Sequence, residues 1–306
     1  MPRIAYFGPS GTFTEMALAQ FESSGVLAGA VERVAASSPP AALALVRDGS
    51  VDGAVVPIES SVEGPVRPTL DALAVGERLQ IMAETELDVS FTIVGRPGTT
   101  LGDVRTIRAY PVAEAQVREW IESTLPDAAV ESASSNAGAA EDVAAGRADA
   151  GVSTALAGER LGLVALASDV ADFAGARTRF VLVTRPAPVP PATGSDRTSV
   201  VLQLNHEPGS LVSAMSEFAT RGIDLTRIES RPTRIEFGTY RFYLDCTGHI
   251  EDSAVAEALK ALHRKHTVRF LGSWPAATDG GKRPPSDDEA NDWLQRIVAG
   301  ENEGTN

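Results

Sequence analysis

A repeated junction restricts the fold of this chain more than any other feature of its sequence. At each junction an apolar, β-branched run ends in hydroxyl or amide side chains directly before a run with helical periodicity. Such alternation of short apolar runs with helical segments is typical of an α/β fold. The junctions contain Ser10 and Thr12, Ser60 and Ser61, Ser134, Ser135 and Asn136, and Ser153 and Thr154.

The N-termini of helices present free N–H groups and a partial positive charge, so they suit anions. In a fold with two lobes, we expect junctions of this kind to meet at the cleft between the lobes. The sequence therefore predicts an interlobe cleft that holds a small polyanionic molecule, with Arg179 and Arg177 adding full positive charges.

Two α/β runs follow one another in the first part of the chain, separated by a long β-rich segment at residues 80–94. This segment suits a strand that crosses between two lobes. In the second run, residues 111–124 are predicted to form one helix. We predict a single domain over residues 1–185, with one lobe made of roughly residues 1–80 and 168–185 and the other of residues 81–167.

A proline-rich stretch at residues 186–191 begins a stiff linker of the polyproline II type, residues 186–197. Strand-forming and helix-forming runs then follow in the order βαββαβ over residues 198–275, which predicts a ferredoxin-like sandwich. The remaining residues, 276–306, are predicted to form a polar tail with Gly280 and Gly281 and an amphipathic C-terminal helix. A capping box of Ser286 and Glu289 would begin this helix, and its apolar residues are Trp293, Leu294, Ile297 and Val298.

Composition excludes several classes of protein. The formal net charge of −14 over 306 residues argues against non-specific binding of nucleic acid, and no apolar run is long enough for a membrane helix. The single cysteine, Cys246, cannot form an intramolecular disulfide, which favours a cytoplasmic protein.

The residues that precede the proline-rich stretch contain no His, Cys or Lys. This excludes a His-based triad, a cysteine nucleophile, a Schiff-base lysine and a phosphate-loop lysine from that region. The sequence predicts neither a metal site nor a cofactor.

The segment at residues 175–183 carries the strongest candidate for chemistry. Thr178 and Arg179 come directly before an apolar, β-branched run, so they lie at the start of a strand, where an α/β fold places its ligand. The alternative is a buried strand whose first residues are polar.

Over residues 3–274, the chain resembles the prephenate dehydratase family with a C-terminal ACT regulatory domain. The resemblance implies a two-lobed catalytic domain like type II periplasmic binding proteins, followed by an ACT domain. Three positions depart from the family pattern: Ser60 and Ala176 stand where the family usually or often has Asn, and Ser210 where it often has Ala. The motifs that carry the resemblance are Gly8-Pro9-Ser10-Gly11-Thr12-Phe13-Thr14, Val56-Pro57-Ile58-Glu59-Ser60-Ser61, Ser135-Asn136, Thr178-Arg179-Phe180, Gly209-Ser210-Leu211-Val212 and Glu229-Ser230-Arg231-Pro232.

The resemblance implies conversion of prephenate to phenylpyruvate, with loss of carbon dioxide and water, and a role for Thr178 as hydrogen-bond donor to the departing hydroxyl. It implies that Arg179 binds a substrate carboxylate; the alternative for Arg179 is an ion pair. The other expected substrate-binding residues, which are alternatively helix caps or core, are Thr12, Glu59, Ser61, Ser135, Asn136 and Phe180.

The resemblance also implies feedback regulation by L-phenylalanine at the ACT domain, in a homodimer or homotetramer. Two other functions fit the same sequence: a non-enzymatic amino-acid sensor, and an arogenate dehydratase. The residues expected to bind phenylalanine are Asn205, Pro208, Gly209, Ser210, Leu211 and Val212, with Glu229, Ser230, Arg231 and Pro232 of a second subunit.

Overall fold

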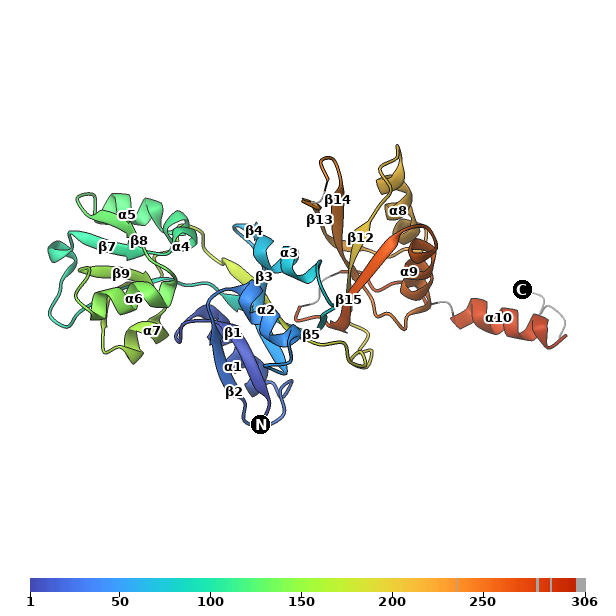
Figure 1. Cartoon of the computed structure of the whole chain (residues 1–306), viewed down its shortest axis with the longest axis horizontal. Coiled ribbons are helices and arrows are strands. Elements are labelled where there is room, and N and C mark those ends of the chain that lie inside the picture. Colours follow the sequence, from blue (N-terminus) through green and yellow to red (C-terminus); the bar gives the residue numbers. More distant parts are fainter. Residues whose placement is uncertain (235, 279–280, 287, 301–306) are drawn as a thin grey trace. The chain divides into compact units, whose positions relative to one another are not determined.

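The computed structural model describes residues 1–234, 236–278, 281–286 and 288–300 (Figure 1). The chain divides into two compact units. The first contains residues 1–79 and 83–185, and the second contains residues 80–82 and the chain from Pro186 onward. Of the predicted tail, residues 279–280 (which include Gly280), 287 and 301–306 lie outside the described residues.

The first sheet of the first unit has the strand order β2-β1-β3-β11-β5, with the short β4 paired to β3. β1 is parallel to β2 and to β3, whereas β11 is antiparallel to β3. Helix α1 packs on this sheet through Leu18 and Phe21, which share a core with Ile4 and Tyr6. The strands are β1 (Arg3–Phe7), β2 (Glu32–Ala36), β3 (Gly53–Ser60), β4 (Gly64–Pro65), β5 (Gln80–Asp88) and β11 (Arg177–Thr184), and the helices are α1 (Phe13–Ser23), α2 (Pro39–Arg47) and α3 (Arg67–Leu73).

The second sheet of the first unit has the order β10-β6-β9-β7-β8. Its core contains Ile93, Ile107 and Val152 from the strands and Val117 and Ile121 from the helical segment that follows β7. The elements are β6 (Thr92–Gly95), η1 (Leu101–Asp103), β7 (Thr106–Ala109), α4 (Pro111–Gln116), α5 (Arg118–Thr124), β8 (Ala129–Ser132), α6 (Asn136–Ala144), β9 (Ala150–Ser153), α7 (Ala155–Arg160) and β10 (Val164–Ser168).

The prediction of one strand over residues 80–94 is wrong, because β5 and β6 are separate strands in different sheets. The residues between them pair with the second crossing segment, which joins β10 to β11. Val89 N donates to Ala176 O at 2.7 Å, and Val170 N donates to Phe91 O at 3.2 Å. The chain therefore crosses between the sheets on two short segments that are hydrogen-bonded to each other.

The prediction of one helix over residues 111–124 is also wrong. The helix is interrupted at Val117, where φ is −126°, and α5 begins again one residue later. The carboxylate of Asp172 accepts hydrogen bonds from Glu119 N and Trp120 N, both at 3.0 Å. A tertiary contact thus supplies the cap of α5, and no local sequence signal could predict it.

The second unit confirms the predicted βαββαβ order. Its antiparallel sheet has the order β13-β14-β12-β15, and Phe218 of α8 and Leu262 of α9 share a core with Val200, Leu202 and Leu244. The elements are β12 (Asp196–Gln203), α8 (Ser210–Ala219), β13 (Leu225–Pro232), β14 (Tyr240–Thr247), α9 (Ser253–Lys265) and β15 (Thr267–Pro275).

The predicted C-terminal helix is present as α10 (Asp288–Val298), and none of its residues is buried. Ser286 Oγ accepts a hydrogen bond from Asp288 N at 3.1 Å. Within the part of the chain that the structure describes, no helix is long and apolar enough to cross a membrane.

Strand β5 contributes its first three residues to the second unit and the rest to the first. Gln80 Nε2 donates to Ala187 O at 2.8 Å. Gly272 of β15 has a φ of +149°, and a Cβ atom there would lie 2.3 Å from Ile81 O. Only glycine therefore allows β15 to approach the beginning of β5 this closely.

Candidate functional site

A cavity of about 760 Å³ in the first unit is lined by residues from the first sheet, from the crossing segment and from the segments that follow β7 and β8. Phe13 and Phe91, which pack edge to face with ring centroids 5.8 Å apart, are among the aromatic residues that line it. The expected site residues that line the cavity are Thr12, Ser135, Asn136, Thr178 and Phe180.

Thr178 lines this cavity from β11, and Phe180 lines it two residues later. Because side chains alternate between the two faces of a strand, Arg179 between them faces away. The Thr178 side chain is half-buried and forms no hydrogen bond with any residue that the structure describes. Its hydroxyl is therefore available to a ligand in the cavity.

Arg179 is not among the residues that line the cavity. Its guanidinium pairs with Glu59 on β3 at 3.3 Å and with Glu84 on β5 at 3.5 Å. Since β11 lies between β3 and β5, these two ion pairs join three neighbouring strands. Arg177 is not among the lining residues either, and it pairs with Asp88 at 2.9 Å and Glu86 at 3.7 Å.

Glu59 and Ser61, which were expected to contact substrate, do not line the cavity either. Glu59 is engaged with Arg179. Ser61 Oγ accepts a hydrogen bond from Arg177 N at 2.9 Å, and Ser61 N donates to Arg177 O at 2.8 Å. Both residues therefore hold the end of β3 against the beginning of β11, where Thr178 lies.

At two of the predicted junctions, a hydroxyl residue that lines the cavity is the N-cap of a helix of eight or more residues. Thr12 is the N-cap of α1, and its Oγ1 also donates to Phe7 O at 2.9 Å. Ser135 is the N-cap of α6, and its Oγ accepts from Gly138 N at 2.9 Å. The adjacent Asn136 has a buried Oδ1 with no hydrogen-bond partner among the described residues.

The predicted convergence of all four junctions is wrong for one of them, because Ser153 and Thr154 are not among the lining residues. Ser153 Oγ donates to Asn136 O, and Thr154 Oγ1 donates to Gly11 O, both at 2.7 Å. These hydroxyl groups are used to join α6 and α7 to their neighbours. The side chains of the fourth junction therefore form hydrogen bonds within the first unit and do not line the cavity.

Two charged residues line the cavity that no sequence pattern indicated. Among the described lining residues, Arg67 at the beginning of α3 carries the positive charge and Glu63 carries the negative charge. Both are exposed. A lone arginine before a proline has no distinctive pattern, so only the fold reveals its position.

The family model for prephenate dehydratase matches residues 4–188, and the model for the ACT domain matches residues 198–264. A prephenate dehydratase of Mycolicibacterium vanbaalenii is 61% identical over 310 residues, which covers 98% of this chain and 99% of the relative. This chain belongs to the prephenate dehydratase family.

Solved structures are also similar over most of the chain. The prephenate dehydratase of Arthrobacter aurescens in complex with L-Phe has a TM-score of 0.88 and 39% identity, covering 97% of this chain and 99% of that one. A protein described as GqqA, a novel type of quorum quenching acylase, has a TM-score of 0.77 and 32% identity, covering 90% and 98%. The fold of the prephenate dehydratase family is thus shared with a protein named for another reaction.

The second unit of this family member contains a cavity of about 180 Å³ around the loop before α8. Of the residues expected to bind phenylalanine, Asn205, Ser210 and Leu211 line it. Gly209 is the N-cap of α8 with a φ of +84°, a backbone conformation that favours glycine. The expected residues Pro208, Gly209, Val212, Glu229, Ser230, Arg231 and Pro232 do not line this cavity, and the last four lie on the edge strand β13.

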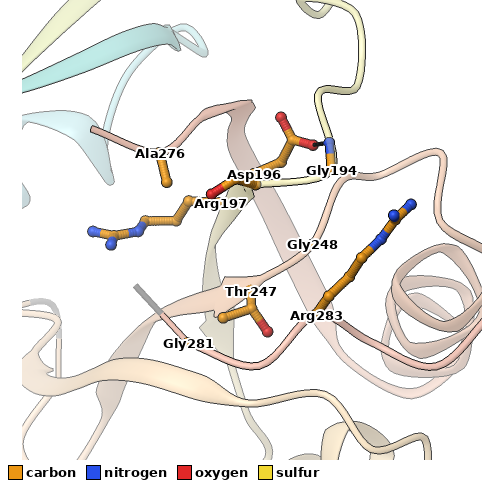
Figure 2. Close-up of a pocket in the computed structure, with 9 residues that line it drawn as sticks. Gly194, Asp196, Arg197, Thr247, Gly248, Ala276, Gly281 and Arg283 are labelled. Carbon is orange, nitrogen blue, oxygen red and sulfur yellow. Dashed lines mark hydrogen bonds between the residues drawn. The ribbon is translucent and has the colours of Figure 1, made fainter. Parts of the chain in front are cut away.

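A smaller cavity of about 160 Å³ lies elsewhere in the second unit. Arg197 and Arg283 belong to its lining, and Figure 2 shows their guanidinium groups directed away from each other. The carboxylate of Asp196 accepts hydrogen bonds from Thr193 N and Gly194 N, both at 2.8 Å. This cavity therefore lacks the converging positive groups that would bind an anion.

Proposed function

We propose that this chain converts prephenate to phenylpyruvate, and that Thr178 donates a hydrogen bond to the hydroxyl group that leaves. The observation that carries the proposal is the Thr178 hydroxyl, which lines the large cavity and has no hydrogen-bond partner among the described residues. The hydroxyl groups of Thr12, Ser61, Ser135 and Thr154, by contrast, already form hydrogen bonds with the backbone.

The reaction requires few catalytic groups from the protein. As the bond between the ring and its carboxylate breaks, the electron pair moves into the ring and expels the hydroxyl on the opposite carbon. One proton joins that hydroxyl, so the products are phenylpyruvate, carbon dioxide and water. The gain of aromaticity drives the reaction. The protein therefore needs to supply only the positioning of the substrate and one well-placed hydrogen-bond donor. A threonine hydroxyl is a very weak acid, so Thr178 donates a hydrogen bond or relays a proton.

The remaining site residues divide into two groups. We propose that Asn136 contacts the substrate, since a ligand donor would satisfy its buried Oδ1. Ser135 and Thr12 present the N-termini of α6 and α1 to it, and Phe180 supplies apolar wall. Arg179, Glu59 and Ser61 act indirectly: their contacts fix β11 against its neighbours and thereby orient Thr178.

We propose that L-phenylalanine binds the second unit and inhibits the enzyme. The proposal is supported by the ACT family match, by the Arthrobacter aurescens protein, whose structure is described as a complex with L-Phe, and by the cavity at Asn205, Ser210 and Leu211. A second subunit would contribute the exposed edge strand β13, which makes the functional form a homodimer or homotetramer. We place the enzyme in the cytoplasm, in keeping with its single cysteine.

The experiment that tests the activity is an incubation of the purified chain with prephenate, followed by the absorbance of phenylpyruvate in alkali. Parallel reactions with arogenate and with an N-acyl substrate separate the rival activities. Formation of phenylpyruvate, with slower use of the other two compounds, supports the proposal. Binding of prephenate without turnover would identify a sensor, and preferential turnover of arogenate or of the N-acyl compound would replace the proposed substrate.

A further inference from the structure

We propose that Arg67 binds the carboxylate of the pyruvyl side chain of the substrate, the one that is retained in the product. This inference rests on the proposed function, because it assigns a residue to that substrate. It starts from the charges of the large cavity, where Arg67 is the cationic residue among the described lining residues. A dicarboxylate substrate needs at least one such group.

The other arginines near the cavity are already neutralised. Arg179 pairs with Glu59 and Glu84, and Arg177 pairs with Asp88 and Glu86. Arg67 differs, because it forms no hydrogen bond and no ion pair with any residue that the structure describes. Its planar guanidinium therefore keeps all its donors for a carboxylate, which it can bind through two parallel hydrogen bonds.

The strand register places Arg67 at a suitable distance from Thr178. Thr178 is opposite Ser60, and Ser60 is opposite Gly64, so the three residues form a row across β11, β3 and β4. Two strand spacings separate Thr178 from Gly64, which is about 10 Å. Arg67 follows Gly64 by three residues, and it lines the same cavity as Thr178.

Chemistry decides which of the two carboxylates Arg67 holds. The ring carboxylate loses its charge as carbon dioxide forms, so a cation paired with it would stabilise the substrate more than the transition state and slow the reaction. The side-chain carboxylate keeps its charge from substrate to product. A cation that pairs with this group strengthens binding throughout the reaction without opposing bond breaking.

The test compares Arg67→Gln and Arg67→Lys with the wild type. Arg118→Gln is the matched control, since Arg118 is also the exposed first residue of a seven-residue helix in the first unit and does not line the cavity. We expect Arg67→Gln to raise KM for prephenate by about tenfold or more with kcat nearly unchanged, the effect of a lost charged hydrogen bond. Arg67→Lys should raise KM less, because it keeps the charge but not the planar fork.

Inhibition by phenylpyruvate identifies the carboxylate. The product retains only the side-chain carboxylate, so Arg67→Gln should weaken competitive inhibition by phenylpyruvate by the same factor as it raises KM. Increasing salt should raise KM in the wild type more than in Arg67→Gln. If phenylpyruvate inhibits both proteins equally, or if KM is unchanged, the assignment of Arg67 is wrong. A wild type that does not turn over prephenate would instead overturn the proposed function.

Discussion

Arg179 and Glu84 form an ion pair between the neighbouring strands β11 and β5, and their side chains are only 6% and 0% exposed. The pair lies one residue from Thr178, on the opposite face of β11. Successive side chains of a strand point to opposite faces, so only Thr178 of these two adjacent residues lines the cavity. The arginine secures the strand, and the threonine faces the ligand.

Replacing Arg179 should therefore affect stability. Arg179→Met leaves Glu84 buried without this cation, so the free energy of unfolding should fall by about 3–5 kcal/mol. The double variant Arg179→Met/Glu84→Gln should recover much of the loss. Arg177→Met is the control, because the Arg177 and Asp88 side chains are 55% and 77% exposed and such surface pairs contribute little. Urea unfolding measures all three, and equal stability of the two single variants would contradict this role of Arg179.

Gly11 lies where the loop before α1 contacts helix α7. Its φ is +90°, and a Cβ atom there would lie 2.8 Å from the Ala157 Cβ on α7. Gly11→Ala should lower the melting temperature through both backbone strain and this clash. Gly25→Ala isolates the strain, since Gly25 has a φ of +78° and nothing within 4 Å of its Cβ position. Equal melting temperatures for the two variants would show that the contact with α7 is unimportant.

Glu15 makes stability depend on pH. Burial alone raises the pKa of this carboxyl, but the hydrogen bond from Gly11 N–H and the Arg160 guanidinium outweigh burial, and the pKa is below its ordinary value. A depressed carboxyl pKa stabilises the folded state above the unfolded pKa, and this contribution is lost as pH falls through the folded pKa. Between about pH 5 and pH 3, stability should fall more steeply in wild type than in Glu15→Gln.

Urea unfolding across this pH range gives the comparison. Glu122→Gln is the control because Glu122 is an exposed residue of α5. It should keep the wild-type slope. A Glu15→Gln variant with the wild-type slope would mean that the contacts of Glu15 do not stabilise the folded state.

Sequence patterns predicted the order of elements well because they depend on local chemistry. The caps at Thr12, Ser135 and Thr154 and the βαββαβ order of the second unit follow from side chains close in sequence. Thr178 and Asn136 were predicted to be near a ligand, and both line one cavity.

The errors have tertiary causes. The chain crosses between the two sheets near Val89, which is hydrogen-bonded to Ala176, and Asp172 caps a helix from more than fifty residues away. The partners of Arg179 come from two other strands, so its ion pairs could not be recognised in the motif itself. Arg67 became a candidate only when the fold brought the beginning of α3 to the cavity.

The regulatory proposal predicts that Gly209→Val abolishes binding of L-phenylalanine. Valine is strained at a φ of +84°, and its side chain changes the loop that leads into α8. Isothermal titration with phenylalanine should show binding by the wild type only, and inhibition of turnover should disappear with it. If Gly209→Val binds and responds like the wild type, the effector site lies elsewhere.

The central claim concerns the hydroxyl of Thr178. Thr178→Val keeps the shape of the side chain but removes the donor, Thr178→Ser keeps the donor, and Thr184→Val makes the same change at the other end of β11, outside the cavity. The most direct test is kcat for prephenate in these three variants. We predict that Thr178→Val lowers kcat by about 10²–10⁴-fold, while the other two retain most of the activity. A correctly folded Thr178→Val enzyme with near wild-type kcat would contradict the role of Thr178.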